Sequence, residues 1–284
     1  MTIGDLIRTY EKELSEAGIS DARFEITEII SDVLRCSPSE LMLRMNDEID
    51  RSLTDPLIIR LKENEPVPYI LGKAYFYNEV YEVGKGVLIP RPDTEILVSK
   101  AVEVILSSGN RSPVIWDLCT GTGCVGISLG NALRKKGVTP RIFLVDKFEE
   151  ALEYTRKNLE QASYRDSFEI VRADILQDIP VQEKPDYIIS NPPYINSKDM
   201  KELPLSVKDH EPLTALFGES DDGLTFYRRI AILAKDIRSG GAVIVEHGYD
   251  QAELVREIFF FAGLKDPSSF KDFGGNMRVT LAFR

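Results

Sequence analysis

The chain has 284 residues, of which 43% are hydrophobic and 29% are charged, the balance of an ordinary globular protein. At about 150 residues per domain, this length predicts two domains. No run approaches the roughly 18 apolar residues of a membrane helix, and the first residues lack the basic and then apolar layout of a signal peptide. We therefore expect a cytoplasmic protein that does not associate with membranes.

The net charge is −11, from 35 Lys and Arg against 46 Asp and Glu. Proteins that grip nucleic acid need a basic face, because neutralised phosphates supply most of the affinity. The acidic balance therefore favours a protein or small-molecule substrate and predicts no stable nucleic-acid binding. Cys36, Cys119 and Cys124 lack zinc-ligand spacing, so we expect neither disulfides nor a metal site. Cys119 and Cys124 flank a glycine-rich turn, which is typical of small packing residues.

The first part of the chain predicts a small helical bundle, residues 1–73. Apolar residues recur there at helical spacing, and the predicted helices span residues 3–14, 24–34, 39–45 and 53–61. Ser37-Pro38 has the pattern of an N-cap followed by a first-turn proline. The segment Glu65-Pro66-Val67-Pro68 is predicted to end the last helix.

A β-hairpin connector is predicted over residues 74–92. Its first half alternates in the manner of strands, and two prolines around Arg91 stiffen the second half. Asp93 or Thr94 is expected to cap the following helix with its side chain. This helix opens the second domain, residues 93–284.

Strand-like and helix-like segments alternate from Pro113 onward, which is typical of a parallel α/β sheet. The predicted strands are residues 114–118, 141–145, 168–172, 186–190, 242–246, 266–273 and 277–283. The predicted helices are residues 123–135, 149–161, 224–237 and 251–261. Gly274-Gly275-Asn276 joins the last two strands as a hairpin, so we expect a Rossmann-like fold with a mixed seven-stranded sheet.

A glycine-rich loop follows the first of these strands. Gly121, Gly123 and Gly126 spell GxGxxG at a strand-to-helix turn, where free N–H groups can face a ligand. Asp146, at the end of the second strand, is placed to hold a ribose. NAD is the obvious ligand, but Asp117 just before the glycines would repel a pyrophosphate. A carboxylate there suits the cationic S-adenosylmethionine, which we therefore predict as the cofactor.

A third acidic residue, Asp174, follows the third strand. It could accept a hydrogen bond from the adenine amino group while Ile175 packs on the ring; a helix N-cap is its alternative role. The complete set of predicted cofactor-binding residues is Asp117, Cys119, Thr120, Gly121, Thr122, Gly123, Asp146, Asp174, Ile175 and Asn191.

The most specific feature is Asn191-Pro192-Pro193-Tyr194, a stiff turn at the end of the fourth strand. The Asn191 side chain and the Pro192 carbonyl offer two adjacent acceptors, which match the NH₂ of a primary amide or a nucleobase. Tyr194 supplies a face on which a planar group stacks. Such acceptors raise electron density on nitrogen and align it for direct methyl transfer without a strong base. We predict Asn191, Pro192 and Tyr194 as catalytic residues, with Pro193 completing the substrate-binding set.

With these motifs in hand, the chain resembles the release-factor glutamine methyltransferases of the HemK/PrmC type. The likeness includes Pro68 to Gly72, Leu88 to Glu95, Asp117 to Gly123, Asn191 to Tyr194, Glu211-Pro212, Ala215-Leu216, Asp222 to Leu224 and Tyr227-Arg228. The resemblance implies a class I methyltransferase fold that methylates N5 of the glutamine in the Gly-Gly-Gln motif of class I peptide-chain release factors. S-adenosylmethionine would become S-adenosylhomocysteine. It also implies that the helical domain helps to grip the factor.

The resemblance further implies that Asn191 to Tyr194 clasp the glutamine and that the Cys119 to Gly123 loop, Asp146 and the position of Ile175 bind cofactor. Relatives often carry an aromatic residue in place of Ile175. We expect a monomer whose partners are release factors, and we expect His210 and His247 to be structural.

Four alternatives stay open. An N6-adenine or N2-guanine methyltransferase uses the same Asn-Pro-Pro-Tyr logic on a flipped base. A sibling family methylates a ribosomal-protein glutamine, although Arg91 to Glu95 looks more like the release-factor type. A binding protein without turnover and an NAD-dependent oxidoreductase are the other two.

Overall fold

The computed structural model describes residues 1–19 and 22–284. The chain forms two compact units: Met1–Lys73 with Pro204–His210, and Ala74–Leu203 with Glu211–Arg284. The predicted connector falls in the second unit. Pro204–His210 lies inside the predicted second domain but is grouped with the first unit. No helix of the described residues is long and apolar enough to cross a membrane.

The first unit is a helical bundle around one apolar core. Its helices are α1 (Ile3–Glu16), α2 (Arg23–Val33), α3 (Pro38–Leu43), α4 (Asp55–Lys62), α5 (Val67–Leu71) and α9 (Leu205–Lys208), with a 3₁₀ turn η1 (Arg51–Leu53). The predicted cap is confirmed, because Ser37 accepts a hydrogen bond from the Glu40 N–H at 3.2 Å in a full capping box.

One expectation for this unit is incomplete, since the proline-rich segment does not only end a helix. It also begins α5, with Pro68 in the first turn and Gly72 at φ 71° behind the last residue. The N–H groups in the first turn of a helix have no partner within the helix. Proline has no N–H and is therefore tolerated in the first turn, so a proline can begin a helix as well as end one.

The second unit begins with a hairpin of β1 (Lys73–Phe76) and β2 (Glu79–Glu82). Tyr77 and Asn78 take positive φ at the turn, as a two-residue hairpin loop requires. Phe76 and Tyr81 bury their rings in the core of the second unit.

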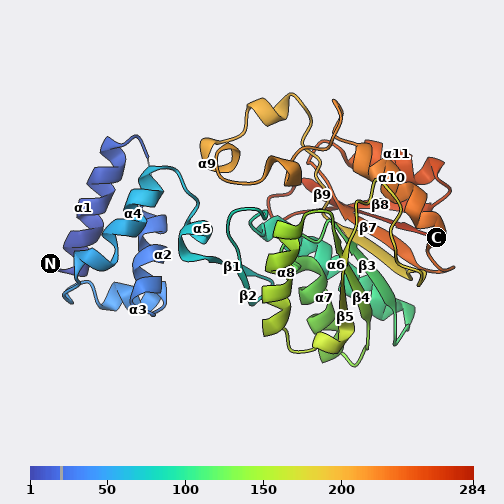
Figure 1. The fold of residues 1–284 in the computed structure, drawn as a ribbon, viewed down its shortest axis with the longest axis horizontal. Coiled ribbons are helices and arrows are strands. Elements are labelled where there is room, and N and C mark those ends of the chain that lie inside the picture. Colours follow the sequence, from blue (N-terminus) through green and yellow to red (C-terminus); the bar gives the residue numbers. More distant parts are fainter. Residues whose placement is uncertain (20–21) are drawn as a thin grey trace. The chain divides into compact units, whose positions relative to one another are not determined.

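A seven-stranded sheet forms the body of the second unit (Figure 1). Its strands are β3 (Val114–Leu118), β4 (Arg141–Asp146), β5 (Phe168–Arg172), β6 (Tyr187–Ser190), β7 (Ala242–Glu246), β8 (Lys265–Lys271) and β9 (Met277–Phe283). The order is β5-β4-β3-β6-β7-β9-β8, and β9 runs in the direction opposite to the other six strands. The predicted mixed sheet and its final hairpin are therefore confirmed.

Helices cover both faces of this sheet (Figure 1). The helices α6 (Glu95–Ser108), α7 (Cys124–Lys135) and α8 (Glu149–Gln161) lie on one face, and α10 (Thr225–Leu233) and α11 (Ala252–Phe261) lie on the other. Short 3₁₀ turns are η2 (Pro92–Thr94), η3 (Arg165–Ser167), η4 (Asp199–Lys201), η5 (Leu213–Ala215) and η6 (Ala234–Asp236). Strand side chains alternate between the two cores, as Ile115 and Trp116 do.

The strand order creates a switch point between β3 and β6. After β3 the chain adds β4 and β5 on one side of β3. It then crosses over and places β6 and β7 on the other side. The loops that follow β3, β4 and β6 therefore meet at one edge of the sheet, which is where open α/β sheets bind ligands.

Candidate active site

The glycine-rich loop is held by Asp117, which lies on β3 just before the loop and is 1% exposed. Its Oδ2 accepts hydrogen bonds from Thr120 Oγ1 at 2.5 Å and from the N–H of Gly126 at 3.0 Å. A Cβ at position 126 would lie 2.7 Å from that oxygen. Glycine is therefore needed at this position for α7 to pack this closely against Asp117 on β3. Burial raises the pKa of Asp117 to about 7, against the lowering effect of these two donors.

Asp146 holds the same loop from the next strand. Its Oδ2 accepts from the N–H of Gly121 at 2.9 Å, and its Oδ1 accepts from the N–H of Phe148 at 3.0 Å. Thr155, on α8, donates to the Gly121 carbonyl at 2.7 Å. The loop conformation is thus fixed by side chains from two other elements. Burial raises the pKa of Asp146, and the backbone donors oppose that rise.

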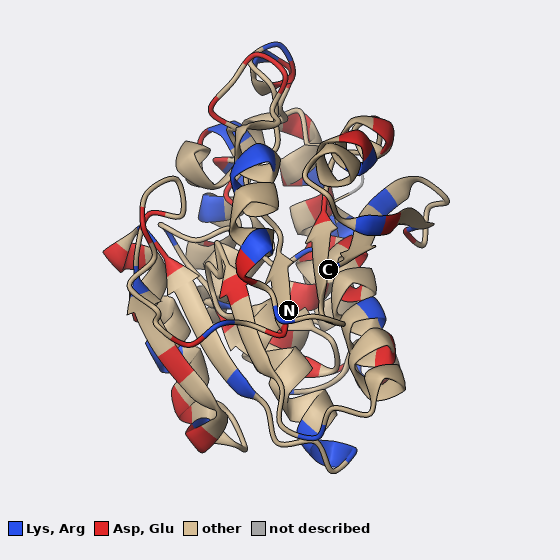
Figure 2. Ribbon diagram, turned by 90° about the vertical axis from the view of Figure 1, so that its right-hand side faces the viewer, with Lys and Arg blue, Asp and Glu red and all other residues tan. Residues whose placement is uncertain are grey.

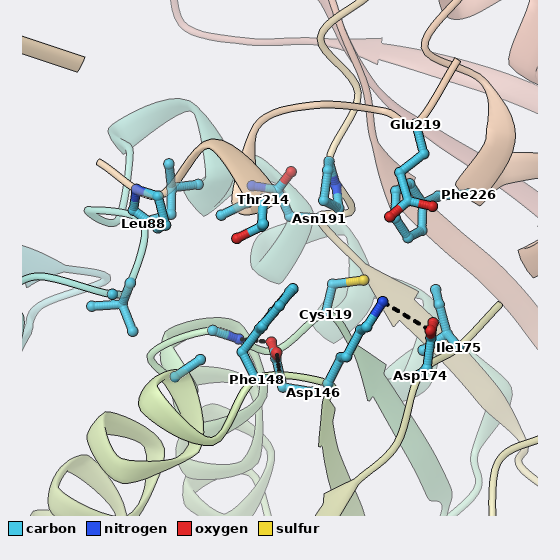
Figure 3. Close-up of a pocket in the computed structure, with 18 of the residues that line it drawn as sticks. Leu88, Cys119, Asp146, Phe148, Asp174, Ile175, Asn191, Thr214, Glu219 and Phe226 are labelled. Carbon is cyan, nitrogen blue, oxygen red and sulfur yellow. Dashed lines mark hydrogen bonds and ion pairs between the residues drawn. The ribbon is translucent and has the colours of Figure 1, made fainter. Parts of the chain in front are cut away.

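A cavity lies above this loop, with about 730 Å³ of empty space including the part open to solvent. Figure 3 shows Asp146 and Phe148 on one side, Asn191 and Thr214 on the other, and the Cys119 thiol between them. Cys119 is therefore more than a packing residue, since it lines the cavity and holds φ at 58°.

Asp174 and Ile175 form another part of the cavity wall (Figure 3). Asp174 Oδ1 accepts from the N–H of Leu176 at 3.0 Å, and its Oδ2 pairs with Lys147 Nζ at 3.0 Å. The segment after Asp174 is a turn and not a helix. The alternative of a helix N-cap is therefore wrong, because the side chain closes a local turn instead.

A smaller cavity of about 410 Å³ adjoins the loop beside η2 and the start of α7. Among the predicted cofactor residues, Asp117, Thr120 and Thr122 line this cavity, while Cys119, Gly121 and Asn191 line both. Gly123 lines neither of the two. It precedes α7 at φ 81°, where a Cβ would meet Ile127 Cδ1 at 2.9 Å, so its role in the structure is conformational.

Asn191 stands where the two cavities meet, directly after β6. Its Nδ2 donates to Thr94 Oγ1 at 3.2 Å, which leaves Oδ1 as the amide atom available to accept from a ligand. The predicted capping role of Asp93 or Thr94 is wrong, since neither side chain caps α6. The Thr94 hydroxyl is directed to Asn191 instead, because η2 turns it inward, where it is 2% exposed.

The rest of the Asn-Pro-Pro-Tyr turn is fixed from several directions. The Tyr194 carbonyl accepts from Gln251 Nε2 at 3.0 Å, and Gly223, at φ 68°, packs directly on that carbonyl. Ile195 pairs in parallel with Phe217, donating to the Leu216 carbonyl at 2.8 Å. Pro193 lines the larger cavity, while Pro192 is buried and Tyr194 packs against the core.

Both histidines make internal hydrogen bonds. His247 is fully buried, with Nε2 2.8 Å from Thr280 Oγ1 and Nδ1 2.8 Å from the Gly248 carbonyl oxygen. Burial lowers its pKa to about 4, so it is neutral at pH 7. His210 Nε2 lies 3.0 Å from the Glu63 carbonyl oxygen. Neither residue is among those that line the two cavities.

Comparisons with known proteins assign the family. The sequence matches the PrmC N-terminal domain over residues 5–72 and the Methyltransferase small domain over residues 94–205. It is 37% identical to the release factor glutamine methyltransferase of Thermodesulfovibrio yellowstonii, over 90% of this chain and 91% of that protein. The release factor glutamine methyltransferase of Fusobacterium nucleatum is 31% identical, over 98% of this chain and 78% of the relative.

The chain belongs to the release factor glutamine methyltransferase family. It is an S-adenosylmethionine-dependent methyltransferase of the class I, Rossmann-like fold. The site fits that cofactor, because its loop carries no basic side chain and the carboxylates of Asp117 and Asp146 stand beside the glycines. The two basic residues that line the cavities are paired with carboxylates, Lys147 with Asp174 and Arg91 with Glu211. A pyrophosphate would meet repulsion there, whereas an ammonium and a sulfonium would not.

Solved structures show the same fold at lower similarity. The catalytic domain of hMettl16, solved with MAT2A 3′UTR hairpin 6 and with hairpin 1, matches with TM-scores of 0.55 and 0.56 at 20% identity. Each match covers 72% of this chain, and 75% and 74% of those chains. Figure 2 shows Lys and Arg of the described residues interspersed with Asp and Glu, not gathered along one stripe as in many nucleic-acid binders.

Sequence reasoning missed several residues that shape the site. The missed cavity walls are Gly86 to Leu88, Lys147, Phe148, Pro212, Thr214, Ala215, Glu219 and Phe226. Phe226 lies on α10, and the others lie on loops or short turns. Leu88, Pro212 and Ala215 belong to segments quoted for the resemblance, but sequence reasoning assigned them no role in the cavity, because only the fold brings them together. It also missed that Thr94 contacts Asn191, although the pattern around Arg91 to Glu95 was noted; the contact spans 97 residues of sequence.

Proposed function

We propose that this chain transfers the methyl group of S-adenosylmethionine to the N5 amide nitrogen of the glutamine in the Gly-Gly-Gln motif of class I peptide-chain release factors. The products are the methylated factor, which alters translation termination, S-adenosylhomocysteine, and the proton that the methylated nitrogen releases to solvent. The orientation of Asn191 carries the proposal, because its Nδ2 is engaged by Thr94 and its Oδ1 is left for a substrate N–H. The names of the relatives point to the same substrate.

In this proposal the Asn191-Pro192-Pro193-Tyr194 turn clasps the glutamine amide. Asn191 Oδ1 and the Pro192 carbonyl accept the two N–H bonds, and the Tyr194 ring covers the planar group. Pro193 and the fixed Tyr194 carbonyl keep the turn stiff. Both acceptors strengthen as positive charge develops on the amide nitrogen, which stabilises the transition state more than the ground state.

The bound cofactor supplies an electrophilic methyl group on a sulfonium. We assign its binding to the Cys119 to Gly123 loop with Asp117, to Asp146 for the ribose hydroxyls, and to Asp174 and Ile175 for the adenine. The backbone of the loop is held in place by Asp117 and Asp146. No histidine is needed as a base, because the amide nitrogen becomes acidic only after it is methylated.

The first unit is proposed to recognise the release factor, as a domain over residues 1–73, with residues 74–92 as connector and 93–284 as the methyltransferase domain. A cytoplasmic location is part of the proposal, because release factors act on ribosomes. The monomeric state and the lack of stable nucleic-acid binding stay predictions.

Labelled cofactor tests the proposal in three parallel reactions, with unmethylated release factor, with duplex DNA and with RNA hairpins. We expect label in the release factor alone. Label confined to a nucleic acid would contradict the proposal in favour of the base-flipping alternative. Label in ribosomal protein but not in release factor would assign the chain to the sibling activity.

A further inference from the structure

A buried carboxylate stands at the end of the strand next to β6. Glu246, the last residue of β7, is 2% exposed, and its Oε2 is buried without a hydrogen-bond partner among the described residues. Burying an incompletely paired carboxylate is costly, so its presence calls for an explanation. Neither cofactor nor substrate binding, as described above, uses this residue.

Glu246 lies beside Asn191, because Ser190 and Val245, the residues just before them, are partners in the ladder of β6 and β7. Thr94 and Asn191 are also the hydrogen-bonding side chains that lower the pKa of the Glu246 carboxyl. Asn191 Nδ2 also donates to Thr94 Oγ1 at 3.2 Å. These three side chains come from η2, from the turn after β6 and from β7, so the fold assembles them from distant parts of the sequence.

The carboxylate determines which way these hydrogen bonds run. An ionised carboxylate only accepts, and a threonine hydroxyl has a single hydrogen to donate. When Thr94 gives that hydrogen to Glu246, its oxygen can only accept from Asn191. Asn191 must then turn its Nδ2 inward and its Oδ1 outward. An amide rotated by 180° would have no inward donor for either partner.

We propose that Glu246 is a positioning residue that fixes the orientation of the Asn191 amide through Thr94, so that Oδ1 faces the N–H group of the substrate amide. This inference rests on the proposed role of Asn191 in binding glutamine. If position 246 carries a neutral donor, the hydrogen bonds can reverse. Asn191 then presents Nδ2 to the substrate NH₂, and two donors face each other.

The charge of Glu246 gives this role a pH dependence. Burial raises its pKa to about 7, against the hydrogen bond from Thr94 and the charge of Arg278. The ionisable groups that face it are Arg278, Asp93, Tyr194, Tyr227 and Cys124. The orientation requires the charged form, so kcat should rise as the pH rises through 7 and should lose this step in Glu246→Gln.

The test compares Glu246→Gln, Thr94→Val and Thr94→Ser in methylation of unmethylated release factor, with cofactor affinity measured by calorimetry. Thr94 makes no cap bond, so valine removes only the link to Glu246 and Asn191. We expect kcat to fall about 100-fold in Thr94→Val and at least about 10-fold in Glu246→Gln, with unchanged cofactor Kd. Thr94→Ser keeps the hydroxyl and should stay within about threefold of wild type.

Thr280→Val is the matched control, because Thr280 is also buried and, among the described residues, its hydroxyl hydrogen-bonds to His247 and Ser269. It should lower stability but not kcat. Wild-type kcat in both Glu246→Gln and Thr94→Val, with an inactive Asn191→Ala, would overturn this inference and leave the proposed function intact. An active Asn191→Ala would instead overturn the proposed role of Asn191. If Thr94→Val fails to bind cofactor, the inference is tested by Glu246→Gln alone. A wild-type kcat and an unchanged pH profile in that variant would overturn it.

Discussion

Gly223 is the residue whose replacement tests most sharply how the Asn-Pro-Pro-Tyr turn is held. An added Cβ would collide with the Tyr194 carbonyl oxygen and lie 2.9 Å from Gln251 Nε2, which binds that same carbonyl. Alanine at φ 68° costs about 1 kcal/mol or more in strain, and the collision adds about 1–3 kcal/mol of overpacking. For a domain of this size, Gly223→Ala should therefore lower Tm by roughly 4–16 °C.

The same collision displaces the turn that holds the reacting nitrogen. A misplacement of about 1 Å costs on the order of 100-fold in rate, so kcat should fall by about that factor at a temperature where the variant is folded. Gly240→Ala is the matched control: Gly240 also has positive φ, at 86°, but nothing lies within 4 Å of the added Cβ. Tm is measured by thermal unfolding and kcat from initial rates, in both variants. Equal Tm and kcat in the two variants would refute the packing role of Gly223.

Three further predictions concern single side chains of the site. Asn191→Ala removes one acceptor for the substrate N–H and should lower kcat by about 100- to 1,000-fold. The control Asn196→Ala breaks a local turn and should leave kcat unchanged. Methylation rates at saturating cofactor compare the two variants. Asp146→Ala removes the acceptor of the Gly121 N–H and the proposed ribose ligand, and should raise the cofactor Kd at least about 10-fold by calorimetry; an unchanged Kd contradicts the assignment. Because burial raises the pKa of Glu246 from 4.5 to about 7, the folded chain keeps a proton that the unfolded chain releases, so this group's contribution to stability is present below pH 4.5 and is lost as the pH rises through 7. Urea unfolding across that range should show a shallower loss of stability in Glu246→Gln than in wild type, and parallel curves would contradict the assignment.

Much of the fold follows from periodicity in the sequence. The runs that become β3, β5 and α8 have the predicted bounds, because buried strands and amphipathic helices carry strong local patterns. Pro66 to Pro68 misled the prediction because proline both ends and begins helices, and only the packing of α5 decides between the two.

The residues of the site also fall into two groups, those set by local sequence and those set by packing. The Gly-rich loop and the Asn-Pro-Pro-Tyr turn are local motifs whose geometry is set by glycine and proline, so they could be found in the sequence. Thr94 was noted as a helix cap and as part of the segment Leu88 to Glu95, and Glu246 only as the last residue of a strand. Their link to Asn191 depends on which strands are neighbours, and β6 lies between β3 and β7 only in the folded sheet.

The central claim is methyl transfer to one side-chain amide nitrogen, and tandem mass spectrometry of the release factor tests it most directly. Unmethylated factor is incubated with the chain and S-adenosylmethionine, digested and sequenced around Gly-Gly-Gln. A factor whose glutamine is replaced by alanine serves as control. We predict one added methyl group on that glutamine and none in the control. A methyl group elsewhere, or equal methylation of the control, would contradict the account.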